Sequence, residues 1–211
     1  MALGAWAMYA EAGPVLRGGD TARERIAATA STNGPIGAGL LTTAVSLADC
    51  EQVMLPFGRR ATPEQLGDAR DALLDECEHM ANDVLARTPA HGQAELLLAL
   101  IAEARGDVDG ISTHLARSEA LQPNLARVVA PRAALGQRHF DELSPDAQER
   151  HQRDLVLMLQ SGRGVWPLAD LYVSDEAARK RITTALEEVS PREQERFIYI
   201  VRRVLGARGA R

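Results

Sequence analysis

Apolar residues recur at steps of three and four along most of this chain, which is the spacing of one face of an α-helix. The clearest series follows Thr62-Pro63, where a capping residue precedes a proline that suits the first helical turn. The apolar positions of this series are Leu66, Ala69, Leu73, Cys77, Met80, Ala81 and Val84. The pattern therefore predicts a helix from residue 62 to residue 87 that packs on one side.

Similar series, bounded by capping residues, prolines and glycines, predict helices along the rest of the chain. Asp20 is the expected cap of the first, and Pro131 is expected to kink one helix or divide it into two pieces. A short apolar segment at 166–173 surrounds Pro167. The predicted helices occupy residues 21–30, 37–54, 91–105, 108–122, 125–135, 145–160, 175–189 and 191–205.

Composition favours the same fold class. Leu and Ala dominate, aromatic residues make up only 4% of the chain, and β-branched residues rarely follow one another. A chain of 211 residues is long enough to bury one core without metals or disulfides. We expect an all-α protein, with an N-terminal apolar stub and linker or short helix at 1–34 and a single helical domain at 35–211.

Two prolines, Pro89 and Pro123, lie 34 residues apart, and each closes a helical series. When residues 75–89 are aligned with residues 109–123, an Asp, an Ala and the Pro coincide. Thirty-four residues is the period of the tetratricopeptide repeat, a pair of helices joined by a turn. Segment 92–125 resembles that family well and segment 37–91 loosely, whereas Glu95 and Ile111 depart from its pattern. The matching residues are Leu98, Ala99, Ala102, Gly106, Asp107, Leu115, Ser118 and Pro123.

The resemblance implies antiparallel helix pairs stacked as a short right-handed solenoid, with irregular helices after Pro123 that cap its C-terminal side. In the tetratricopeptide family the first helix of each pair forms most of a concave groove, which can hold a peptide or a partner helix. Carried over to this chain, the groove residues are Thr42, Thr43, Ser46, Glu95, Leu96 and Ala99. The resemblance thus predicts an unidentified protein or peptide partner.

Two cysteines, Cys50 and Cys77, lie on successive predicted helices, with no Cys-x-x-Cys motif and no Cys/His cluster at zinc-ligand spacing. A disulfide between them is within reach if the helices pack antiparallel and the Cα atoms lie within about 7 Å. A disulfide would fit an exported protein, and two buried free thiols would fit a cytoplasmic one. The sequence leaves both open.

The first ten residues are apolar and include Trp6 and Tyr9, which suits a membrane interface. They lack the basic region that opens a signal peptide, and no stretch reaches the roughly 20 apolar residues needed to span a bilayer. Two interpretations stay open, the remnant of a longer membrane anchor or signal and an ordinary amphipathic helix.

The net charge is −5, and Lys180 is the only lysine, so nearly all positive charge is arginine. This overall charge does not indicate the basic surface that nucleic-acid-binding proteins carry. Two local runs each have two interpretations. Acidic residues on one flank of the helix at 62–87 form a solvated face or a strip for a basic partner: Asp68, Asp71, Asp75 and Glu78. Basic residues near the C-terminus form a solvated face or an anion contact: Arg192, Arg196, Arg202, Arg203, Arg208 and Arg211.

No catalytic or metal-binding signature accompanies these patterns. The chain has no Gly-x-Ser-x-Gly elbow, and its serines fall mostly at helix caps. His151 and Asp154 have a helical spacing of three, but no second pair of ligands accompanies them. We expect no catalytic residue, metal or cofactor.

The leading interpretation is a non-enzymatic interaction adaptor with tetratricopeptide-like repeats. Its layout resembles accessory components of bacterial cell-envelope or exopolysaccharide assembly, anchored in the inner membrane and facing the periplasm. A cytoplasmic interaction or regulatory module is the first alternative. An all-α enzyme is the second, and its site would be assembled from scattered residues: His151, Asp154, Trp166 and Tyr172. The oligomeric state is left open.

Overall fold

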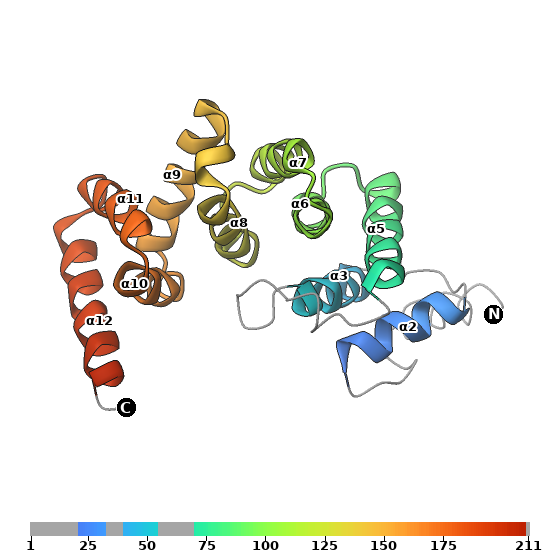
Figure 1. Cartoon of the computed structure of the whole chain (residues 1–211), viewed down its shortest axis with the longest axis horizontal. Coiled ribbons are helices and arrows are strands. Elements are labelled where there is room, and N and C mark those ends of the chain that lie inside the picture. The colour runs from blue at the N-terminus through green and yellow to red at the C-terminus, as the bar shows by residue number, and fades with distance from the viewer. Residues whose placement is uncertain (1–20, 33–39, 55–69, 210–211) are drawn as a thin grey trace. The chain divides into compact units, whose positions relative to one another are not determined.

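The computed structural model describes residues 21–32, 40–54 and 70–209. All regular structure in these ranges is helical, which confirms the all-α expectation (Figure 1). The apolar segment at residues 1–10, the expected cap Asp20, and the Thr62-Pro63 cap with Asp68 lie outside the described residues. The chain divides into two compact units, residues 1–121 and 122–211, where we expected one domain from residue 35 onward. The boundary falls between Leu121 and Gln122, next to Pro123, where the 34-residue spacing ends.

The first unit contains five described helices. They are α2 (Ala22–Thr32), α3 (Leu40–Met54), α5 (Arg70–Arg87), α6 (Gly92–Arg105) and α7 (Val108–Leu121). Helix α2 packs against α3 and α5, while α3 and α5 also pack against each other. A reciprocal cap opens α2: the Thr21 hydroxyl accepts a hydrogen bond from the Glu24 N–H, and the Glu24 carboxylate accepts one from the Thr21 N–H.

Helix α6 is the centre of the first unit. It packs against α3, α5 and α7, and every residue from Gly92 to Glu103 is buried. A helix enclosed on all sides needs apolar or small residues around its whole circumference, and the run Leu96-Leu-Leu-Ala-Leu-Ile-Ala102 supplies them. His91 caps its start, because its Nδ1 accepts a hydrogen bond from the Ala94 N–H at 3.3 Å.

The turn between α6 and α7 is a Schellman motif. Gly106 has a φ of 78°, in the left-handed region. The N–H of Gly106 donates to the Glu103 carbonyl at 3.1 Å, and the N–H of Asp107 donates to the Ala102 carbonyl at 2.9 Å. The Asp107 carboxylate then accepts from the Gly110 N–H and caps α7. The Gly-Asp pair in the sequence therefore ends one helix and begins the next.

A disulfide joins α3 to α5. The Cα atoms of Cys50 and Cys77 lie 5.9 Å apart, within the range for a bridge, and both residues are fully buried. Beside it the Arg25 guanidinium of α2 makes two hydrogen bonds to the Asp49 carboxylate of α3, at 2.8 and 2.5 Å. The disulfide and the Arg25–Asp49 contact therefore link α2, α3 and α5, which other segments separate along the sequence.

The second unit contains α8 (Ala126–Arg138), a 3₁₀ turn (Phe140–Glu142), α9 (Pro145–Gln160), α10 (Val165–Ser174), α11 (Glu176–Glu187) and α12 (Pro191–Gly209). Helix α9 packs against the other four helices, and α10 packs against α11 and α12. Leu155, Leu159 and Phe197 are among the core residues that these helices bury. The apolar segment around Pro167 thus forms a helix of its own.

Pro131 lies inside α8 without dividing it. We expected a kink or two short pieces, and the structure has one helix from Ala126 to Arg138. Pro131 removes one backbone donor, but Val128, Val129 and Ala133 pack into the core on either side of it. Burial of these side chains outweighs the loss of a single helical hydrogen bond.

Candidate interaction surface

Five of the six residues predicted to line a groove are buried. Leu96 and Ala99 have no exposed area, and Glu95 is 6% exposed. On α3, Thr43 and Ser46 are also buried, and Thr42 lies in the helix with a side chain outside the description. The prediction made α6 part of the lining of an open groove, but α6 is enclosed by its neighbours. The five described side chains therefore offer no surface to a peptide.

Glu95 has an internal partner instead. Its carboxylate lies 2.7 Å from Nδ1 of His114 on α7 and 4.0 Å from the Arg117 guanidinium. A buried carboxylate needs such partners, because loss of hydration is unfavourable to its charged form. The departure from the tetratricopeptide pattern at position 95 is thus matched by a polar contact between α6 and α7.

The acidic flank of α5 is partly neutralised within the first unit. Arg105, at the end of α6, lies 2.7 Å from both the Asp75 and the Glu78 carboxylates. The two carboxylates raise the pKa of Arg105 through hydrogen bonding and charge, and desolvation opposes them. Asp71 pairs with Arg70 at 3.0 Å. The two Arg105 pairs favour a role in packing α5 against α6 over a free strip for a basic partner.

The four residues of the enzyme alternative are each engaged separately. Asp154 forms a buried ion pair with Arg132, at 2.7 and 2.6 Å, with the two side chains 4% and 3% exposed. Tyr172 packs edge-on against Phe197, with ring centroids 5.3 Å apart. Trp166 lies beneath Arg203 on the surface. The structure brings no three of the four to one site.

His151 is buried in the second unit, in contact with both polar and apolar neighbours. Its Nε2 lies 3.3 Å from the Gln137 side-chain oxygen, which also accepts a hydrogen bond from Arg181 at 3.1 Å. Its ring packs edge-on against Phe140, and its Nδ1 faces Gly136 so closely that a Cβ there would lie 2.9 Å away. Burial, with a smaller effect of the Arg181 charge, lowers the pKa of His151 to about 4. This histidine is neutral and structural at neutral pH.

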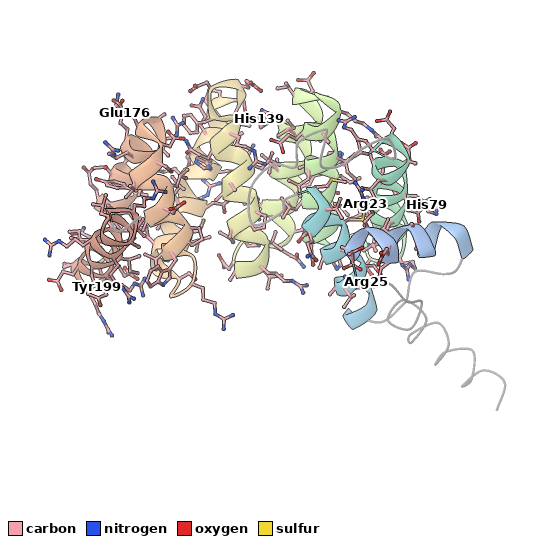
Figure 2. The ribbon with its side chains drawn as sticks, turned by 60° about the horizontal axis from the view of Figure 1, so that its bottom comes forward. Arg23, Arg25, His79, His139, Glu176 and Tyr199 are labelled. Carbon is pink, nitrogen blue, oxygen red and sulfur yellow. A yellow bond between two sulfur atoms is a disulfide. The ribbon has the colours of Figure 1, made fainter. Side chains whose placement is uncertain are left out.

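An exposed group of large side chains lies on α10 and α12. Trp166 is 42% exposed, Ile198 49% and Tyr199 60%. The Arg203 guanidinium carbon lies 5.3 Å from the Trp166 ring centroid and 6.0 Å from that of Tyr199. Figure 2 shows Tyr199 among side chains that project outward from α12. We call Trp166, Ile198, Tyr199 and Arg203 the aromatic–arginine patch.

The packing of α12 produces this patch. Phe197 and Ile200 turn into the core, so Ile198 and Tyr199 must face away from it. Ser190 and Glu193 fix the start of the helix, since the Glu193 carboxylate accepts both the N–H and the hydroxyl of Ser190 at 2.9 Å. These hydrogen bonds lower the pKa of Glu193. Near the C-terminal end of α12 the Arg208 guanidinium forms an ion pair with the Asp170 carboxylate of α10 at 2.5 Å.

Only part of this surface could be predicted from the residue pattern. The pattern predicts a last helix at 191–205 with basic residues along it, but it singles out neither Ile198 nor Tyr199. The sequence does contain a signal for Ile198, because it directly follows Phe197 of the buried stripe. A step of one residue turns about 100° around a helix, so Ile198 lies outside that stripe. Trp166 could not be assigned to the surface, because its segment was not recognised as a helix.

No group of three or more His, Cys, Asp or Glu side chains in the described ranges is arranged to hold a metal ion. Within the same ranges no helix has the length and apolar character that crossing a membrane requires. Comparison of the chain with protein-family models, curated proteins and solved structures found no match.

Proposed function

We propose that this protein is a non-enzymatic helical scaffold that binds other proteins through the aromatic–arginine patch. The exposure of Trp166, Ile198 and Tyr199 together carries the proposal. Isolated apolar residues are common on protein surfaces, but Trp, Tyr and Arg gathered at one place have the composition of protein-binding hot spots. Their position on two packed helices keeps the patch rigid before a partner arrives, which reduces the entropy lost on binding.

The chemistry of the patch indicates the kind of protein surface it accepts. Arg203 and its neighbour Arg202 form no ion pair among the residues that the structure describes. Stacking on Trp166 holds the Arg203 guanidinium in place and leaves its N–H groups available to carboxylates. A partner surface with carboxylates beside apolar side chains therefore fits best.

A tetratricopeptide-like architecture is part of this proposal for the first unit. Helices α3 and α5 would form one pair and α6 and α7 the next. The packing of α6 against both α3 and α5 supports this assignment, as does the Schellman turn at Gly106. Pro89 and Pro123 are each the second residue after the second helix of a pair, at the 34-residue spacing. In this arrangement the repeats serve as a closed support rather than as a peptide groove.

We also place the protein outside the cytoplasm, in association with bacterial cell-envelope or exopolysaccharide assembly. The Cys50–Cys77 disulfide supports an oxidising compartment, because cytoplasmic thiols are usually kept reduced. Titration of free thiols in unfolded protein from its native source tests this part: no thiol should react before reductant is added. Two reactive thiols would instead favour the cytoplasmic alternative.

Affinity capture with tagged full-length protein tests the binding proposal. Wild-type protein should retain a discrete partner, and the combined variant Trp166→Ser with Tyr199→Ser should lose it at an unchanged melting temperature. Val45→Ser is the matched control, since Val45 is an exposed apolar residue on α3 of the other unit. Equal retention by wild type and the double variant would overturn the proposal.

A further inference from the structure

Helix α12 carries a second regular pattern on its outer face. Four residues spaced at steps of three, four and three form one stripe along the helix. They are Glu195, Ile198, Arg202 and Leu205. All four are exposed, with Ile198 at 49% and Leu205 at 51%. We call these four residues the outer stripe. Its spacing is that of a seam between two helices, but no described helix covers it.

The two charged members of the outer stripe have no partner in their own chain. Neither Glu195 nor Arg202 makes an ion pair or side-chain hydrogen bond within the described part of the chain. Some other charges on the same unit are paired, as Arg153 is with Glu149 and Arg208 with Asp170. An acid and a base seven residues apart on one helix lie on the same face, two turns from each other.

Two copies of α12 in antiparallel contact would pair these charges. If Glu195 of one copy lies opposite Arg202 of the second copy, twofold symmetry places Arg202 opposite Glu195 as well. The midpoint of that register falls between residues 198 and 199. Ile198 then meets Tyr199 of the second copy twice, at the centre of the contact.

The same register contains no like-charge contact. Along the helix axes Arg192 is level with Leu205 of the second copy and Arg203 with Gln194, so no two like charges are level with each other. Antiparallel helices also bring the partial positive charge of each N-terminus near the partial negative charge of the other C-terminus. One register thus satisfies the free charges, the exposed apolar residues and the helix dipoles together.

We propose that α12 binds α12 of a second copy of this chain, as a symmetric antiparallel dimer with Glu195 paired to Arg202. The inference rests on the proposed function, because it names the first partner of the α12 face. Trp166 and Arg203 border the contact, and Arg203 remains stacked on Trp166 at its edge.

Sedimentation equilibrium of the full chain at moderate salt tests the dimer. Wild-type protein should associate, and Glu195→Arg or Arg202→Glu alone should weaken association about tenfold, because each turns two attractive contacts into repulsive ones. The double variant Glu195→Arg with Arg202→Glu should restore association, since the pair is only exchanged. Arg153→Glu on α9 is the control and should leave association unchanged.

Mixing the two single variants gives the sharper result. A chain with Glu195→Arg presents arginine at both positions, and a chain with Arg202→Glu presents glutamate at both. The mixture should form heterodimers although each variant alone is mainly monomeric. A monomeric wild type, or single variants that associate as well as wild type, would overturn the inference. If the wild type is monomeric yet its capture of another protein still depends on Trp166 and Tyr199, the dimer fails and the proposed function stands.

Discussion

At the scale of single residues, Gly106 determines how α6 ends. Its φ of 78° lies in a region that residues with a Cβ rarely adopt, and no other heavy atom would crowd a Cβ there. Gly106→Ala should therefore destabilise the protein by about 1 kcal/mol through backbone strain alone. Gly162→Ala is the matched control, because Gly162 also has open space but no positive φ. Denaturant unfolding should show a lower midpoint for the first variant only.

His151 makes stability depend on pH. Its pKa is lowered from 6.5 to about 4 in the folded state, so between these values the unfolded chain binds a proton that the folded chain does not. The free energy of unfolding should therefore fall as pH drops from about 6.5 to about 4, by about 3 kcal/mol from this group. Above pH 6.5 the contribution is complete and constant.

Thermal or urea unfolding across that pH range measures the effect. His151→Gln should remove this part of the slope, so its stability should approach that of wild type as pH falls toward 4. His79→Gln, at an exposed position on α5, should leave the slope as it is. Identical slopes for wild type and His151→Gln would show that His151 is protonated equally in both states.

At the scale of helices, the sequence predicted starts better than interruptions. Ser144 and Asp175 cap α9 and α11 close to the predicted starts of the helices at 145–160 and 175–189, by accepting hydrogen bonds from the N–H groups of Ala147 and Ala178. Such signals act within four residues and are visible locally. Pro131 also acts locally, but it lies inside α8, whose flanking side chains are buried. The energy that overrides Pro131 comes from contacts distant in sequence, which a local pattern does not contain. Pro167 lies in the first turn of α10, where its missing N–H has no helical partner in any case.

The disulfide acts at the same scale, because it fixes α3 against α5. It closes a loop with a sequence separation of 27 residues. The chain-entropy model gives about 3–4 kcal/mol of stabilisation for a loop of that size. Reductant should therefore lower the midpoint of urea unfolding of the wild type. The combined variant Cys50→Ala with Cys77→Ala should be less stable from the start and should not respond to reductant. A wild type that unfolds at the same urea concentration with and without reductant would contradict this role.

At the scale of the whole molecule, the sequence predicted the helical class but not which surfaces are open. Glu95, Leu96 and Ala99 matched a groove by position in a repeat, yet their exposure depends on what encloses α6. Charge is also unevenly divided: residues 1–121 carry 17 acidic and 9 basic side chains, and residues 122–211 carry 12 and 15. The basic excess of the second unit agrees with an α12 face that accepts carboxylates.

Site-specific photocrosslinking in cells that naturally make the protein tests the central claim most directly. A benzophenone amino acid replaces Tyr199 in one variant, Val45 in a second and Leu96 in a third. We predict a discrete crosslinked species from position 199 and none from the exposed control at 45 or the buried position 96. A species of twice the chain mass would be the self-dimer, and other masses would be other partners. No crosslink from position 199, with one from position 96, would contradict the account and restore the groove.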